Sequence, residues 1–305
     1  MASNFADLCV PIDENNVPLF EKTLANLKEF GFHAAAVTHR LELLQTKQTP
    51  IPPCPDKSTV AKWAKQSGLT LYTRLTVSLT ENSQLHALAQ EAVRAYDILA
   101  VEPTTEKLFY RTCASLEADI ISFDFTQRLL FFLKTPQVRQ AIRRGMSFEI
   151  LYSPMILDAA ARRNTLTAAM ELIEASKGKN VVLSSGSRGP MDVRGPYDVM
   201  NLGLLFGLKE AMAKETVSVN CRAVIRRAVA RRETSKGVTS MRRVDELAAG
   251  EEWVMKKLKD DDEDSDIGTL EKGDCGQDKG IDEKKNDSDS ENSGDESIAK
   301  KPRVS

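Results

Sequence analysis

The largest group of positively charged side chains that could bind a ligand lies between residues 222 and 243. The bases in this stretch face a single acid, Glu233, and they are Arg222, Arg226, Arg227, Arg231, Arg232, Lys236, Arg242 and Arg243. Arg222 and Arg226 are four residues apart, as are Arg227 and Arg231, so a helix would place each pair on a common face. Such a stripe attracts a phosphate backbone, and an acidic protein surface is the alternative partner.

Residues 186–189 are a second candidate for phosphate binding. Their glycines let the backbone approach an anion closely, and Arg188 supplies positive charge. An ordinary turn has the same composition, so both interpretations stay open. No aromatic pattern of the RNA-recognition-motif type is present in the sequence, which indicates that any bound RNA is recognised through its backbone and shape.

Asp7, Cys9 and His39 are residue types that could hold a zinc ion, because they are expected near the ends of the first two strands. A hydrolytic two-metal centre needs more histidines and carboxylates than this, and the other histidines of the chain are His33 and His86. Packing or hydrogen bonding is the other role for Cys9 and His39, and we favour it. We therefore expect no metal site and no cofactor.

Nucleophilic catalysis has no support from the sequence. No serine and histidine stand in the context of a nucleophile elbow, and Cys113 falls on the apolar face of a predicted helix, where a lone cysteine packs in the core. The five cysteines are widely spaced without a Cys-x-x-Cys pair, which is typical of a reducing compartment. No apolar run reaches the roughly 18 residues of a membrane span, so we expect no membrane partner.

The elements that would position these residues alternate between apolar strands and segments of helical periodicity. Helices are predicted over 19–30, which closes at Gly31, and around 85–93 and 166–173. Strands are predicted at 5–10, 33–38, 69–79, 96–101, 119–125, 147–152 and 180–184. The segment 197–213 has helical character, so no eighth strand is assigned.

Repeated βαβ units require parallel strands with right-handed crossovers, which suit a closed barrel or a doubly wound sheet. A doubly wound sheet that binds nucleotides needs glycines directly after its first strand, and residues 7–11 contain none. We therefore predict an α/β fold of the TIM-like barrel type.

The net charge is distributed unevenly along the chain of 305 residues. From Asp260 onward, 16 acids face 7 bases, which gives this segment a net charge of −9 and leaves residues 1–259 at +7. The acidic segment has no aromatic residue and cannot bury enough apolar surface to fold. We predict a barrel over 1–221, a basic helical extension over 222–259 and a disordered acidic tail over 260–305.

Several blocks of the sequence resemble the family of 30 kDa protein subunits of nuclear ribonuclease P and RNase MRP. The longest runs through 178–185 (GKNVVLSS), 193–199 (VRGPYDV) and 201–208 (NLGLLFGL). Shorter blocks stand at 5–8, 73–76, 96–97, 105–109, 152–154 and 162–163. Together they cover about residues 5–223, so the resemblance is long and specific.

The resemblance implies a TIM-like barrel akin to the phosphoesterases of the polymerase-and-histidinol-phosphatase type. Those enzymes carry Asp-x-His-x-His after the first strand, whereas this chain has Asp7, Cys9 and Pro11. Proline has no side-chain atom that could bind a metal. The resemblance therefore implies a non-catalytic subunit of a ribonucleoprotein, and a metal-dependent phosphoesterase with rearranged ligands is the alternative.

A member of this family is expected to bind the RNA of ribonuclease P and RNase MRP and to support maturation of precursor tRNA and rRNA processing. Other protein subunits, including a small ferredoxin-like one, and a nuclear, nucleolar location are also implied. The residues expected to bind RNA or to support assembly are Arg74, Arg162, Arg163, Lys179, Arg188, Arg194, Arg222, Arg226, Arg227, Arg231 and Arg232.

The acidic tail carries two further kinds of candidate site. Lys300, Lys301 and Arg303 form a basic cluster of the type that nuclear import machinery binds, and solvated linker charge is its alternative role. Ser288 and Ser293 each precede an acid by three residues, which makes them candidates for phosphorylation. A phosphorylated tail would repel RNA more strongly.

Overall fold

Seven parallel strands follow one another in chain order in the computed structural model, which describes residues 4–13, 16–41, 51–89 and 91–233. The strands are β1 (Phe5–Pro11), β2 (Phe32–Leu41), β3 (Thr70–Leu79), β4 (Ile98–Pro103), β5 (Ile120–Ile121), β6 (Ser147–Leu151) and β7 (Val181–Ser184). Most of their residues are buried on both faces, which is why apolar and β-branched side chains fill them. The seven predicted strands are confirmed, with β5 reduced to two residues.

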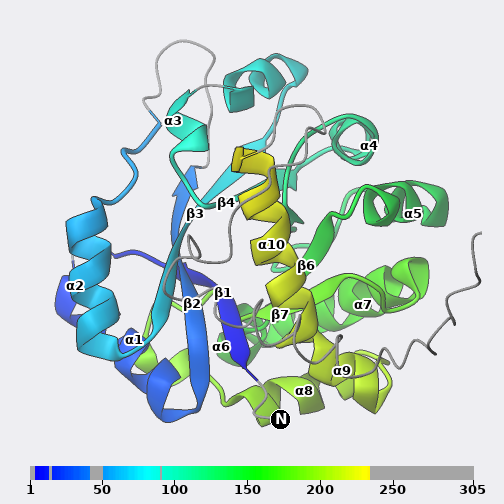
Figure 1. Ribbon diagram of the computed structural model, residues 1–305. Helices are drawn as coiled ribbons and strands as arrows, with labels where there is room; N and C mark the ends of the chain where they lie inside the picture. The colour runs from blue at the N-terminus through cyan, green and yellow to red at the C-terminus, as the bar shows by residue number, and fades with distance from the viewer. Residues whose placement is uncertain (1–3, 14–15, 42–50, 90, 234–305) are drawn as a thin grey trace, which may run out of the picture. The chain divides into compact units, whose positions relative to one another are not determined.

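Helices cover the outside of these strands. The α-helices are α1 (Val17–Glu29), α2 (Lys57–Ser67), α3 (Glu91–Arg94), α4 (Glu106–Ala114), α5 (Thr135–Arg143), α6 (Ser153–Leu157), α7 (Ala159–Ser176), α8 (Pro196–Leu205), α9 (Glu210–Thr216) and α10 (Val219–Glu233). Two short 3-10 helices, η1 (Asn82–Ala89) and η2 (Pro190–Asp192), complete the described elements. Figure 1 shows α4, α5 and α7 following one another along one side of the molecule, with α1 and α2 on the other.

The barrel closes between β7 and β1 without an eighth strand in the described residues. At the N-terminal end of the strands, the Ala6 amide donates to the Val217 carbonyl at 2.9 Å. At the C-terminal end, the Gly186 amide donates to the Cys9 carbonyl at 2.9 Å. The segment 197–213 forms α8 and most of α9, as its periodicity predicts.

Helix α10 covers the N-terminal end of the barrel. Its buried residues Cys221, Val224 and Ala228 pack against a small apolar cluster inside the barrel that includes Leu8 and Ile120. Figure 1 shows α10 in yellow, lying across the strands. The predicted boundary at residue 221 therefore falls inside α10, and residues 222–233 belong to the barrel rather than to an extension.

The rest of the predicted extension and the whole predicted acidic tail lie outside the described residues. Among the helices that the structure describes, none combines the length and apolar composition that a membrane span requires.

Candidate functional site

The centre of the barrel holds an ion pair between Arg74 of β3 and Glu149 of β6. Two guanidinium nitrogens of Arg74 donate to the two carboxylate oxygens of Glu149, each at 2.5 Å. The guanidinium also donates to the Leu8 carbonyl at 2.5 Å and to the Thr76 hydroxyl at 3.0 Å. Both charged side chains are fully buried. The extra hydrogen bonds offset the cost of removing the two charges from water.

This position corrects the expectation that Arg74 lies on an assembly surface. Side chains along β3 alternate between the two faces of the strand, so Tyr72, Arg74 and Thr76 point in the same direction. Tyr72 packs against the apolar cluster inside the barrel, which identifies that direction as inward. Arg74 therefore has no exposed surface with which to contact RNA or a partner.

Asp7 of β1 joins the two sides of the incomplete barrel. Its carboxylate accepts from the amide of Cys9 and from the amide of Ser185 after β7, both at 3.1 Å. Burial raises the pKa of Asp7 to about 6, against the lowering effect of these hydrogen bonds. Burial also raises the pKa of the Cys9 thiol to about 12, which disfavours the thiolate form.

His39 lies away from Asp7 and Cys9. The Tyr96 hydroxyl donates to the Pro52 carbonyl at 2.9 Å, and its oxygen accepts from Nδ1 of His39 at 2.7 Å. The three residues considered as zinc ligands are therefore not brought together. Within the described ranges, no group of three or more histidine, cysteine, aspartate or glutamate side chains could hold a metal ion.

Two other sequence-based interpretations can be compared with the structure. The amide of Gly186 donates to the Cys9 carbonyl, and the amide of Gly189 donates to the Ser187 hydroxyl at 3.2 Å. These amides already have acceptors, so the turn interpretation of residues 186–189 fits better than a phosphate clamp. Cys113 is fully buried in the core, as its position on the apolar face of a helix predicts.

Four of the candidate arginines lie at the C-terminal end of the strands. Arg162 donates to the Met155 carbonyl at 2.8 Å and remains exposed. Arg163 and Arg188 are also exposed. Arg194 donates to the carbonyls of Met191 and Val193, each at 2.8 Å, in place of an ion pair with a neighbouring aspartate.

The remaining candidates lie at the opposite end, where Lys179 is exposed in the turn before β7. The arginines of α10 divide into two sets. Arg231 forms an ion pair with the fully buried Asp119 at 2.9 Å, and the Nε of Arg227 lies 3.9 Å from the same carboxylate. Arg232 pairs with Asp97 at 2.7 Å. These three side chains hold α10 against the barrel.

Arg222 and Arg226 occupy the opposite face of α10, which points away from the barrel. Arg226 is exposed and Arg222 is half-buried. Of the predicted basic stripe in α10, these two side chains lie on the face that is turned away from the barrel. The spacing of four residues correctly groups each pair on a face, although one of the two faces is turned inward.

Several positively charged side chains lie where α10 meets the end of α5. Arg227 donates to the Arg144 carbonyl and, at 3.2 Å, to the Ala118 carbonyl. Burial lowers the pKa of Arg227, and the nearby charges of Arg144 and Arg231 lower it further, against the opposing effect of Asp119. Arg144, Arg227 and Arg231 therefore lie close together at this junction, beside the carboxylates of Asp119 and Glu117.

Sequence analysis missed four bases in this region: Arg111, Arg139, Arg143 and Arg144. A signal was present for three of them, since the segment from Lys134 to Arg144 contains four bases and no acid. The stripe at 222–243 has the same density of bases and is twice as long, so it drew attention first.

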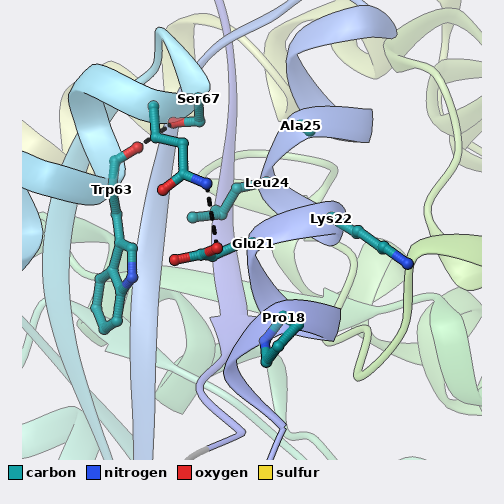
Figure 2. Close-up of a pocket in the computed structure, with 8 residues that line it drawn as sticks. Pro18, Glu21, Lys22, Leu24, Ala25, Trp63 and Ser67 are labelled. Atoms are coloured by element: carbon teal, nitrogen blue, oxygen red, sulfur yellow. Dashed lines mark hydrogen bonds between the residues drawn. The ribbon is translucent and has the colours of Figure 1, made fainter.

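Two hollows lie elsewhere on the described part of the molecule. Figure 2 shows the one between α1 and α2, where Gln66 donates to Glu21 at 3.1 Å beside Trp63 and Leu24. Its volume is about 280 Å³, and its lining holds no histidine or cysteine. The other lies between residues 128–132 and α7, with Leu130 and Phe132 largely exposed.

The fold and these surfaces define a parallel β/α barrel with a buried central ion pair and an arginine-rich helix across its N-terminal end. Residues 4–233 match the family described as RNase P subunit p30, and the chain belongs to this family. The match extends through α10, beyond the region that the sequence blocks covered.

Individual relatives agree with this assignment. Ribonuclease P protein subunit p30 of mouse is 48% identical over 162 residues, which are 52% of this chain and 60% of the mouse protein. A probable ribonuclease P protein subunit 3 of Schizosaccharomyces pombe is 32% identical over 219 residues, covering 71% and 89% of the two chains. The chain thus spans less than two thirds of the mouse relative.

A solved structure has the same fold. A chain in the cryo-EM structure of archaeal ribonuclease P with mature tRNA superimposes with a TM-score of 0.59 at 16% identity. The superposition covers 78% of this chain and 99% of the archaeal one. The predicted TIM-like barrel is confirmed.

Proposed function

We propose that the protein is a non-catalytic subunit of the ribonuclease P and RNase MRP ribonucleoproteins, in which RNA carries the chemistry. The observation that carries this proposal is the family match over residues 4–233, which includes every described strand and α10. The protein would support maturation of the 5′ end of precursor tRNA and rRNA processing by binding the RNA and other protein subunits.

The barrel interior supports the non-catalytic part of the proposal. Arg74 pairs with Glu149 inside the barrel, so this carboxylate is not free to act as an acid, a base or a metal ligand. Cys9 is held as a thiol, and His39 lies outside this group. The alternative of a phosphoesterase with rearranged ligands therefore loses the residues on which it depended.

RNA contact is proposed for the cations at the N-terminal end of the barrel. Arg222, Arg226 and Lys179 point away from the core at this end, and phosphates attract such groups regardless of base sequence. Arg162, Arg163 and Arg188 lie at the other end and are proposed as assembly contacts, with a small ferredoxin-like subunit among the partners. Precursor tRNA would be met through the holoenzyme.

A nuclear and nucleolar location is also proposed, with import through Lys300, Lys301 and Arg303. Residues 260–305 fused to a fluorescent protein should accumulate in the nucleus, because the fusion cannot assemble through the barrel. Changing the three bases to Ala in the same fusion should abolish the accumulation. A fusion that stays evenly distributed would contradict import through this cluster.

The subunit role is tested by affinity purification of the tagged full-length chain from its native cells, followed by sequencing of the bound RNA. We expect one abundant structured RNA and precursor tRNA to be enriched over an untagged control. Recovery of the intact chain without any enriched RNA would overturn the proposal.

A further inference from the structure

Helices α4 and α5 form a rigid pair on the outside of the barrel. At one end, Nζ of Lys134 lies 2.7 Å from Oε1 of Glu106. At the other end, the Arg144 guanidinium donates to the Cys113 carbonyl at 3.0 Å and to the Leu116 carbonyl at 2.7 Å. The two helices are thereby fixed side by side, and Figure 1 shows them adjacent.

The exposed surface of this pair is strongly basic. Arg139 and Arg143 are four residues apart on α5, as are Lys107 and Arg111 on α4, and all four side chains are exposed. Within the described part of the chain, none of the four side chains has an ion pair or hydrogen bond. The acid on α4, Glu106, is already paired with Lys134.

An exposed aromatic ring lies among these cations. Tyr110 is 53% exposed on α4, next to Arg111 and one helical turn from Lys107. It lies four residues after Glu106, on the side of α4 that faces α5. Proteins that bind single-stranded nucleic acid combine exposed aromatic rings with cations. The ring stacks on an unpaired base, and the cations bind the phosphates.

The basic surface is continuous with α10. Arg227 of α10 donates to the Arg144 carbonyl at the end of α5, so the two basic regions meet at this point. A single RNA segment could therefore run from α4 and α5 onto the outward face of α10. An acidic protein would also meet the cations, but it would have no need for the exposed ring.

We propose that the outer surface of α4 and α5 binds an unpaired segment of RNA, with a base stacked on Tyr110 and phosphates bound by Lys107, Arg111, Arg139 and Arg143. This inference rests on the proposed function, because it assigns the RNA of the same complex to a surface. It extends that function to residues that the sequence did not single out.

Ultraviolet crosslinking of the affinity-purified complex tests the base contact. We expect the tryptic peptide 108–111 to carry a covalently bound nucleotide, since Tyr110 would touch the base directly. Tyr197 is the matched control, because it is 68% exposed on α8 without adjacent bases, and its peptide should remain unmodified.

Binding of the full-length chain to the RNA that it recovers tests the phosphate contacts. Arg139→Gln with Arg143→Gln should flatten the dependence of log K on log salt by about 0.7 for each lost contact with a single strand. Tyr110→Ala should weaken binding about tenfold, whereas Tyr110→Phe, which keeps the ring, should bind normally. The control for the α5 variant is Lys62→Gln with Lys65→Gln on α2, which makes the same charge change on the far side of the barrel.

The outcomes separate this proposal from the proposed function. If the wild-type chain recovers no RNA, the proposed function fails and this inference with it. If RNA is recovered but peptide 108–111 is unmodified and the α5 variant binds with unchanged affinity and salt dependence, the surface is not an RNA contact. If the α5 variant loses a protein subunit and keeps its RNA affinity, the surface docks a protein instead.

Discussion

Arg74 and Glu149 are the residues whose roles depend most on the three-dimensional structure. Both lie in the barrel interior without exposure to water, and each leaves an uncompensated charge when the other is removed. Arg74→Met should therefore lower the free energy of unfolding by about 3–5 kcal/mol. Chemical denaturation of the purified chain measures this loss.

The double variant Arg74→Met with Glu149→Leu is the control for this prediction. Replacing both charges with apolar groups removes the unpaired carboxylate, so the double variant should be more stable than Arg74→Met alone. Equal or greater destabilisation of the double variant would show that the ion pair is not what makes Arg74 structurally important.

Asp7 gives the protein a specific dependence of stability on pH. Burial raises its pKa from 3.8 to about 6, so the folded state binds a proton that the unfolded state releases between these pH values. The contribution of Asp7 to the free energy of unfolding is therefore largest below pH 3.8 and falls as the pH rises to about 6. Above that pH the contribution is constant.

The Asp7→Asn variant isolates this effect, because the amide cannot ionise. Relative to the variant, the wild-type chain should lose about 2 kcal/mol of unfolding free energy between pH 4 and pH 7. Denaturation of both proteins across this range measures the difference. Parallel pH profiles would mean that Asp7 is ionised in the folded protein throughout.

At the scale of the element, α10 has an inner and an outer set of arginines with different roles. Arg227→Gln with Arg231→Gln leaves Asp119 buried without its cations, so we expect a loss of about 3–5 kcal/mol in unfolding free energy. Arg222→Gln with Arg226→Gln should change stability by about 1 kcal/mol or less and should weaken RNA binding. Denaturation and salt-dependent RNA binding of the two variants distinguish these roles.

A variant that neutralises Arg226, Arg227, Arg231 and Arg232 together removes cations from both faces of α10. Such a variant would confuse loss of the fold with loss of RNA contacts. The account of α10 fails if the inner variant is fully stable, or if the outer variant binds RNA with unchanged affinity and salt dependence.

The strands were predictable from sequence because each is a short run of apolar and β-branched residues. Which side chains of each strand face the inside of the barrel was not predictable. In a barrel both faces of a strand are buried, so the alternation of Arg74 with Leu75 separates the two residues without showing which faces inward. For the same reason, the sequence could not show that the side chains of His39 and Cys9 are separated.

The role of α10 was also hidden from sequence analysis. Its periodicity places Arg227 and Arg231 on one face, but their partner Asp119 is more than 100 residues away in the chain. A basic face that pairs with a distant carboxylate has the same local pattern as one that binds RNA. The density of bases along the chain therefore could not distinguish the arginines of α10 that pair with carboxylates from those that face away from the barrel.

At the scale of the whole molecule, the barrel has two ends with different surfaces. The N-terminal end carries the cations of α10 and adjoins the basic surface of α4 and α5, whereas residues 7, 9 and 185 close the other end through buried hydrogen bonds. This difference between the two ends fits the proposed role of the protein as a scaffold for RNA and protein partners.

The most direct test of this account is the nuclease sensitivity of precursor tRNA cleavage by the affinity-purified complex. The account predicts that the complex cleaves precursor tRNA at its 5′ end and loses this activity when its RNA is digested, and that the isolated full-length chain is inactive with any divalent metal. Cleavage by the isolated chain, or by a complex freed of RNA, would contradict a non-catalytic role.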